Sequence, residues 1–168
     1  MSDYLLPTAL VDKAREVVEA NRAAGRRVAI AESCTGGLVS AALTEIAGSS
    51  EMFEAGYVTY SNSAKLAALR VGDEVVETFG AVSIATAWAM AQGALDASDA
   101  DVAVAITGIA GPDGGSAQKP VGTVVFARAT RDCPPGQIVA DQTLFDASGG
   151  RSAIRLQAAL CALELLLP

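Results

Sequence analysis

The sequence predicts an α/β protein, a three-layer α/β/α sandwich on a mixed, mostly parallel sheet of about five strands. Segments with apolar residues at helical spacing alternate with short apolar runs along the chain. One run, VAVAIT at 102–107, is continuously apolar, as in a central strand that helices cover on both faces. Two further runs follow each other directly near the C-terminus, which predicts a late hairpin in the same sheet.

The first predicted elements flank a glycine turn. An N-terminal helix is expected to end at Gly25, because apolar residues recur before it at helical spacing: Val11, Ala14, Val17 and Val18. RRVAIAE, residues 26–32, is predicted to be a buried strand. After the SCTGG turn, residues 33–37, a second helix is predicted over LVSAALTEIAG, residues 38–48.

The middle of the chain predicts one more strand and two helices. AGYVTY, residues 55–60, has the composition of a strand, and the polar SNSAK after it opens a helical segment through Arg70. Ser83 is placed to cap a further helix. That helix has an apolar stripe at the expected spacing, formed by Ile84, Ala87, Trp88, Ala91 and Leu95.

The last third predicts a strand, a long loop, a hairpin and a helix. The strand at 102–107 ends in GIAGPDGGSAQKP, residues 108–120, which is rich in glycine and proline. Residues 120–130 and 137–145 are predicted to pair as a hairpin across a Cys133-Pro-Pro-Gly turn. Residues 149–167 are predicted to close the chain as a long helix.

Length and charge limit the classes of function. At 168 residues we expect one domain, residues 1–168. A net charge of −7 argues against binding to nucleic acid or acidic membranes, because polyanions need a basic surface, but leaves a small phosphorylated ligand open.

No secretory signal is recognised, and the apolar C-terminal stretch is too short to span a membrane. We therefore expect a cytoplasmic protein. The apolar stretch predicts a buried or an oligomer-forming helix, and we expect a homo-oligomer.

The chain contains no histidine, and this limits its chemistry more than any other feature of composition. Histidine-based catalytic triads, Cys-His dyads within one chain and zinc sites built on imidazole are all excluded. The three cysteines are widely scattered and form neither a disulfide framework nor a CxxC pair. A hydrolytic reaction would therefore use Lys, Tyr, Asp or Glu to move protons.

The turn after the first strand is the first candidate site. Ser33, before Gly36 and Gly37, is placed at the carboxyl end of a strand, where open α/β sheets bind ligands. Backbone N–H groups of the turn are suited to hold a phosphate or an oxyanion. Two alternatives stay open at this point: Ser33 or Thr35 only caps the helix, or Cys34 is the nucleophile.

Tyr60 and Lys65 form the second candidate site, just after the second strand. A lysine with a lowered pKa, assisted by a tyrosine hydroxyl, is a substitute base for a serine nucleophile where histidine is missing. Their spacing of five matches neither a YxxxK nor an SxxK pair. The competing interpretation is an exposed lysine beside a tyrosine at the edge of the core.

The loop at 107–122 is the third candidate, since long glycine-rich loops in compact domains are usually binding loops or lids. It contains no P-loop motif; Asp113 is a candidate for a sugar hydroxyl and Lys119 for an anion. Arg151 and Arg155, early in the last helix, are candidates for an anion or an ion pair, although a surface role fits Arg155 equally well.

Three motifs, AESCTGGL (31–38), GYVTYSNSAK (56–65) and TGIAGPDGGSAQKPVGTV (107–124), together resemble the CinA C-terminal domain family. Among its members the chain is most similar to the stand-alone, PncC-type nicotinamide-nucleotide amidohydrolases. The resemblance covers nearly the whole chain. It implies deamidation of nicotinamide mononucleotide to nicotinate mononucleotide and ammonia, in pyridine nucleotide salvage, with neither metal nor cofactor.

The resemblance also implies roles for particular residues. The motif serine, tyrosine and lysine, here Ser33, Tyr60 and Lys65, would be the nucleophile and its activating partners. The implied substrate-binding residues are Thr35, Gly36, Gly37, Thr107, Gly108, Gly111 and Arg151. Relatives often have an acid before that arginine, whereas this chain has Gly150. Glu32 is a candidate neighbour for the pyridinium ring, or only a residue at the strand end.

Two other classes of function stay open from the sequence. The domain could bind a nucleotide without turning it over, as a sensor or as a partner of another protein. Alternatively, it is a structural oligomer whose loops complete a neighbour's site. Without the resemblance, the residues support an α/β domain with a histidine-free, serine-centred ligand site.

Overall fold

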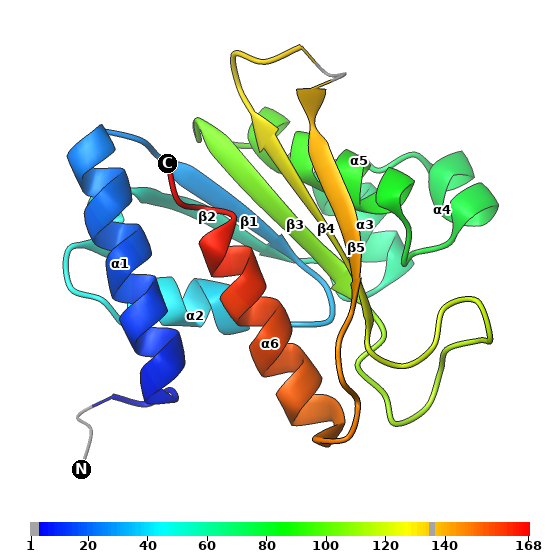
Figure 1. Cartoon of the computed structure of the whole chain (residues 1–168). Coiled ribbons are helices and arrows are strands. Elements are labelled where there is room, and N and C mark those ends of the chain that lie inside the picture. Colours follow the sequence, from blue (N-terminus) through cyan, green and yellow to red (C-terminus); the bar gives the residue numbers. More distant parts are fainter. Residues whose placement is uncertain (1–3, 135–136) are drawn as a thin grey trace.

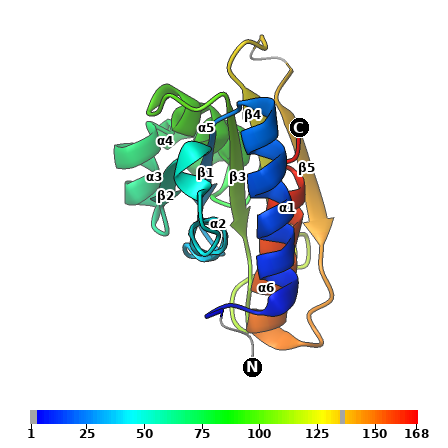
Figure 2. The same cartoon turned by 90° about the vertical axis from the view of Figure 1, so that its left-hand side faces the viewer.

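The computed structural model describes residues 4–134 and 137–168, and it has a central sheet between two layers of helices (Figures 1 and 2). The strands are β1 (Val28–Glu32), β2 (Phe53–Val58), β3 (Val102–Gly108), β4 (Thr123–Thr130) and β5 (Val139–Leu144). They lie in the order β2-β1-β3-β4-β5. β1 pairs in parallel with β2 and β3, whereas β4 runs antiparallel to β3 and β5. All strands except β4 therefore share one direction, which confirms the mixed, mostly parallel sheet and its late hairpin.

Helices cover both faces of the sheet, as Figure 2 shows. One layer contains α1 (Thr8–Ala24), α2 (Leu38–Thr44) and α6 (Gly150–Glu164). The other contains α3 (Asn62–Leu69), α4 (Asp73–Phe79) and α5 (Ile84–Asp96). A short 3₁₀ turn, Ser49–Glu51, leads into β2. The predicted three-layer α/β/α architecture is confirmed.

Several boundaries differ from the predictions. Helix α4 was not predicted, because its seven residues bury only Val76 and leave no long apolar stripe. The second strand is Phe53–Val58 instead of 55–60, so Tyr60 lies beyond its end. The Cys133-Pro-Pro-Gly turn falls partly on residues 135–136, which lie outside the described residues. The predicted caps are confirmed: Gly25 ends α1 in the left-handed conformation, and the Ser83 hydroxyl accepts a hydrogen bond from the Thr86 N–H.

The two faces of the sheet carry side chains of different size. Toward α1, α2 and α6 they are large: Val28, Ile30, Val104, Ile106, Val124 and Phe126. Toward α3, α4 and α5 they are nearly all alanine: Ala29, Ala31, Ala103, Ala105, Ala127 and Ala129. Alternate residues of a strand point to opposite faces, so the V-A-V-A sequence of β3 produces this asymmetry directly. Small side chains allow α5 to pack close to the sheet.

The apolar C-terminal stretch is used within the chain. α6 buries Ile154, Ala158, Ala159, Ala162 and Leu163 in the core that it shares with α1 and α2. Among the described residues, no helix has the combination of length and apolar character that a membrane crossing requires.

Gly93 is expected to be essential for the packing of α5 on α3. A Cβ at this position would lie 2.0 Å from the carbonyl oxygen of Leu69, which is backbone and cannot move aside cheaply. Gly93→Ala should therefore destabilise the protein by about 1–3 kcal/mol, although alanine normally favours an exposed helix by about 1 kcal/mol over glycine. Urea denaturation measures this, with Gln92→Ala on the same helix as a control expected to cost under about 0.5 kcal/mol. A Gly93→Ala protein as stable as the wild type would contradict the close contact.

Candidate active site

The candidate site lies where the parallel strands end. Ser33 follows β1, Tyr60 follows β2, and Thr107 stands at the end of β3, so the pairing of these strands brings the three together. The long loop after β3 and the start of α6 lie at the same end of the sheet (Figures 1 and 2). They enclose a pocket of about 200 Å³ whose polar lining is formed by Ser33, Tyr60, Asn62, Lys65, Thr107 and Arg151. This is the edge at which open α/β sheets bind ligands.

Ser33 and Lys65 are in direct contact at the base of the pocket. Lys65 Nζ lies 3.0 Å from Ser33 Oγ and donates a second hydrogen bond of 2.9 Å to the carbonyl oxygen of Thr59. Lys65 belongs to α3, which is capped by Ser61, whose hydroxyl accepts a hydrogen bond from the Ala64 N–H. The Lys65 side chain is buried, with 1% of its surface exposed, whereas Ser33 is 8% exposed. The lysine is thus a buried group aimed at the hydroxyl.

The environment of Lys65 favours its neutral form. Burial lowers its pKa, because removing an ammonium from water costs free energy, and the nearby Cys34 opposes this only in part. Among the described residues, no carboxylate lies within 4.0 Å of Nζ to hold the charge. A neutral amine has a lone pair that can accept the Ser33 proton. The pair has the geometry and the pKa direction that a general base and a nucleophile need.

Cys34 lines the pocket beside this pair, but its side chain is packed into the core. Its side chain is 5% exposed and packs with the cluster around α1, α2 and α6. Burial raises the pKa of the thiol to about 11. Since the thiolate is the nucleophilic form, this raised pKa disfavours Cys34 as a nucleophile near neutral pH.

Cys34→Ala is therefore expected to retain activity within about threefold, because it removes a buried methylene-sized volume and no reacting group. The measurement is ammonia release at saturating substrate, with the wild type treated with iodoacetamide alongside. Loss of activity in the variant, or inactivation of the folded wild type that parallels alkylation of Cys34 and not of the exposed Cys133, would assign the nucleophile to the Cys34 thiol.

The Glu32 carboxylate stabilises the glycine turn through hydrogen bonds to its backbone and to the start of α2. This buried carboxylate accepts hydrogen bonds from the N–H groups of Gly37, Val39 and Ser40 and from the Ser40 hydroxyl, at 2.7–3.1 Å. It therefore supplies hydrogen-bond acceptors for the free N–H groups at the start of α2, and it does not line the pocket. The structure favours the role of Glu32 as a strand-end residue over contact with a pyridinium ring.

The other predicted residues of the turn lie behind the pocket wall. Gly36 and Gly37 have φ values of 61° and 95°, in the left-handed region that favours glycine. Thr35 is fully buried, and within the described part of the chain its hydroxyl has no hydrogen-bond partner. None of these three lines the pocket, so their assignment to substrate binding stays a prediction.

Arg151 joins three segments of the chain at the pocket mouth. One guanidinium nitrogen donates to the carbonyl oxygen of Gly111 at 2.6 Å, and another donates to the Tyr60 hydroxyl at 2.8 Å. In the described part of the chain, Tyr60 has no hydrogen bond to Ser33 or Lys65. The tyrosine is 60% exposed and stands at the rim.

The end of β3 is tied to the segment before α5. The Thr107 hydroxyl donates to the carbonyl oxygen of Ala81 at 2.8 Å. At Gly108 a Cβ would lie 2.8 Å from a Val124 methyl and 3.1 Å from Cys34 Sγ, so no larger residue fits. Lys119 Nζ donates to the carbonyl oxygens of Val82 and Phe79, and this anchors the long loop. The ammonium group of Lys119, which the sequence suggested for an anion, is therefore used on the backbone.

One residue of the site was missed from the sequence. Asn62, at the start of α3, lines the pocket, but a polar residue after a strand carries no specific signal. Arg155 was left open between binding an anion, forming an ion pair and lying at the surface. In the structure its guanidinium donates to the carbonyl oxygens of Cys34 and Thr35, next to Ser33.

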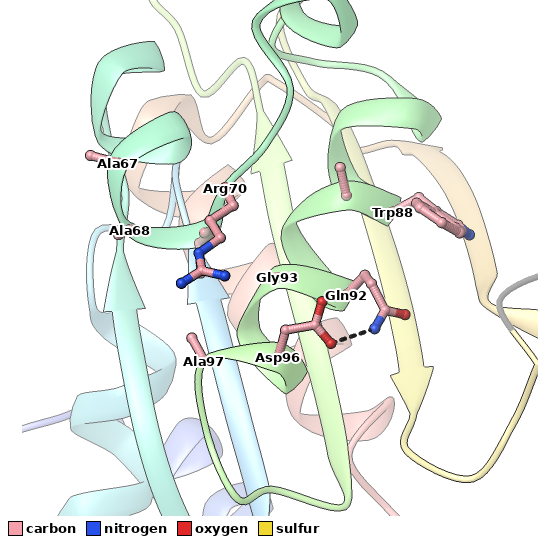
Figure 3. A pocket seen from close by; sticks show the side chains of 10 residues that line it. Ala67, Ala68, Arg70, Trp88, Gln92, Gly93, Asp96 and Ala97 are labelled. Atoms are coloured by element: carbon pink, nitrogen blue, oxygen red, sulfur yellow. Dashed lines mark hydrogen bonds between the residues drawn. The ribbon is translucent and has the colours of Figure 1, made fainter.

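A second pocket, of about 320 Å³, lies between the end of α3 and α5 (Figure 3). Its polar groups are Arg70, Gln92 and Asp96, and the Gln92 amide donates to the Asp96 carboxylate at 2.8 Å. It is larger than the Ser33 pocket but shares no lining residue with it and contains no nucleophile. Elsewhere in the described residues, no group of three His, Cys, Asp or Glu side chains is arranged to hold a metal ion.

The chain belongs to the CinA C-terminal domain family, whose model matches residues 11–168. It is 51% identical to the nicotinamide-nucleotide amidohydrolase PncC of Enterobacter agglomerans, over 90% of each chain. It is 50% identical to the protein of the same name from Escherichia coli K12, over 94% of this chain and 92% of that one. A competence/damage-inducible protein from Agrobacterium tumefaciens has the same fold, with a TM-score of 0.91, 48% identity and coverage of 99% and 97%.

Proposed function

We propose that the protein is an amidohydrolase that deamidates nicotinamide mononucleotide to nicotinate mononucleotide and ammonia, with Ser33 as nucleophile. The observation that carries the proposal is the 3.0 Å contact between Ser33 Oγ and a buried Lys65 whose pKa is lowered. The similarity to relatives named nicotinamide-nucleotide amidohydrolase supports the substrate and the reaction.

The proposed reaction has two halves. Lys65 Nζ takes the proton of Ser33 Oγ, which attacks the carboxamide carbon and forms a tetrahedral intermediate. Lys65 returns the proton to the amide nitrogen, the C–N bond breaks, and ammonia leaves an ester on Ser33. Water then gives a proton to Lys65 and attacks the ester carbon, and Ser33 recovers its proton as nicotinate mononucleotide departs. Backbone N–H groups of the turn stabilise the oxyanion, each worth about 3–4 kcal/mol.

The remaining residues bind and orient the substrate in this proposal. Arg151 lines the pocket and supplies the positive charge for a phosphate or carboxylate. Tyr60 is proposed as the third catalytic group, and Arg151 orients its hydroxyl. Because Ser33 and Lys65 are in direct contact, the first proton transfer does not need a relay through Tyr60. Thr35, Gly36, Gly37, Thr107, Gly108 and Gly111 are proposed to shape the pocket and its oxyanion site.

The test is to follow ammonia and nicotinate mononucleotide from the purified, chelator-treated protein supplied with nicotinamide mononucleotide. The proposal expects stoichiometric release of both products. Saturable binding measured by calorimetry without any ammonia would instead favour the nucleotide sensor. Free nicotinamide as a second substrate tests whether the ribose phosphate is needed, and we expect it to react far more slowly.

The setting of this reaction is also proposed. The reaction class fits salvage of pyridine nucleotides in the cytoplasm, by a homo-oligomer that needs neither metal nor cofactor. Light scattering of the purified protein tests the oligomeric state, and exchange of subunits between inactive variants tests whether neighbouring subunits share a site.

A further inference from the structure

The side chain of Thr107 lies beside the proposed nucleophile, on the neighbouring strand. The parallel ladder of β1 and β3 ends at Glu32 and Ile106, and the Ser33 N–H continues it by donating to the Ile106 carbonyl at 2.9 Å. Thr107 is therefore the neighbour of Ser33 across two strands, and paired strands lie about 4.8 Å apart in a sheet. The two side chains are close enough to contact one small group bound between them.

Ser33 and Thr107 also point to the same face of the sheet. Alternate residues of a strand face opposite layers, and the alanines two positions earlier on both strands pack toward α3, α4 and α5. The contacts agree with this, since Ser33 meets Lys65 of α3 and Thr107 meets Ala81, which precedes α5. Both residues line the pocket, so a group that reacts at Ser33 lies within reach of Thr107.

The Thr107 hydroxyl is available to a ligand as an acceptor. It donates its single proton to the carbonyl oxygen of Ala81 at 2.8 Å, and a carbonyl cannot donate in return. Thr107 is buried, so turning this proton toward a ligand would leave the Ala81 carbonyl without its partner. In the described part of the chain no group donates to the Thr107 oxygen, so its lone pairs are free for a hydrogen-bond donor in the pocket.

A carboxamide and a carboxylate differ in what they offer to such an acceptor. The NH₂ group of a carboxamide has two N–H donors, whereas an ionised carboxylate has none. A buried acceptor that is left without a donor loses free energy, so a site with a fixed acceptor disfavours the analogue that lacks the N–H. An acceptor beside the nucleophile therefore favours an amide substrate over its acid product.

We propose that Thr107 recognises the carboxamide nitrogen by accepting a hydrogen bond from its N–H, and that it thereby makes the site selective for the amide over the acid. This inference rests on the proposed function, with Ser33 as nucleophile. The contact places the nitrogen on the β3 side of Ser33, which fixes how the carboxamide lies for attack. After hydrolysis the carboxylate oxygens face a lone pair of the threonine, which favours release of the product.

The test compares Thr107→Val and Thr107→Ser with the wild type on nicotinamide mononucleotide and on the methyl ester of nicotinate mononucleotide. The two substrates share the ring, the carbonyl and the ribose phosphate, but only the amide has an N–H at the reacting carbon. Thr107→Val should lower kcat/KM about 10- to 100-fold for the amide and change it within about threefold for the ester. Thr107→Ser, which restores the hydroxyl, should keep the wild-type preference. Nicotinate mononucleotide should inhibit Thr107→Val at about three- to tenfold lower concentration than the wild type.

Thr123→Val is the matched control. Thr123 is a buried threonine of the same sheet, but it does not line the pocket, and its hydroxyl has no partner among the described residues. The substitution makes the same chemical change away from Ser33. It should leave the amide-to-ester preference and the inhibition by product as they are in the wild type.

An equal loss on amide and ester in Thr107→Val would mean that the threonine only supports the backbone at Ala81. That result, or an unchanged preference, or a preference lost equally in Thr107→Ser, would overturn the inference and leave the serine mechanism standing. Absence of ammonia release by the wild type would overturn the proposed function and this inference with it. If Thr107→Val does not fold, Thr107→Ala removes the same hydroxyl and carries the comparison.

Discussion

Replacing Ser33 by alanine is expected to lower kcat for deamidation of nicotinamide mononucleotide by at least about 10³-fold, because the other nucleophile near Lys65, the Cys34 thiol, is buried and has a raised pKa. Binding should persist, since the substitution removes one oxygen from the pocket and leaves Arg151 in place. Ammonia release and calorimetric binding measure the two effects on the same preparation. Ser63→Ala, on the exposed side of the start of α3, is the matched control and should retain full activity.

The size of this effect separates two mechanisms. If Lys65 activated water directly, Ser33→Ala would lose only part of the rate, and the variant would still release ammonia well above background. A variant that binds the mononucleotide with wild-type affinity and releases no ammonia agrees with covalent catalysis.

Lys65→Met is expected to cost as much activity as Ser33→Ala, at least about 10³-fold, because nucleophile and base act as one unit. The double variant should be no slower than either single variant. Methionine retains much of the apolar volume of the lysine side chain, so the protein should fold. Lys65→Arg should be equally inactive, since a guanidinium does not release a proton near neutral pH.

The same variant tests the lowered pKa through stability. Below the folded-state pKa of Lys65 both states hold the proton, and the cost of burying the charge is complete. Above it the folded protein releases the proton while the unfolded chain keeps it, so the wild type gains stability relative to Lys65→Met as the pH rises. Urea denaturation between about pH 6 and pH 10 measures this difference. A difference that does not change with pH would mean an ordinary lysine pKa.

The fold could be predicted because its signals are local. The V-A-V-A run of β3, the Ser83 cap and Gly25 each predicted an element without reference to the rest of the chain. Helix α4 was missed because it is short and buries a single residue, so tertiary contacts decide its conformation. The end of β2 was misplaced for a similar reason: the strand composition continues through Thr59 and Tyr60, but pairing with β1 ends at Val58.

The sequence predicted the two side chains that meet at the base of the pocket, Ser33 and Lys65, but not the contacts that hold the surrounding turn and loop. The missing histidine and the residue types left Ser33 with Lys65 as a chemically sensible pair, and parallel pairing of β1 and β2 brings them together. The role of Arg155 depends on how α6 docks against the turn, and no spacing within the sequence contains that information. The contacts of Glu32 and Lys119 with backbone groups could not be predicted for the same reason. Buried N–H and carbonyl groups need hydrogen-bond partners, and only the folded chain shows which side chains supply them.

Identification of the acylated residue tests the central claim most directly. Turnover of nicotinamide mononucleotide is quenched in acid at a series of short times, and the peptides are mapped by mass spectrometry, for the wild type and for Ser33→Ala. We predict an ester of nicotinate mononucleotide on the peptide that contains AESCTGG, located on Ser33, and neither adduct nor ammonia from Ser33→Ala. An adduct on Cys34 or another residue, or an active Ser33→Ala enzyme, would contradict the account.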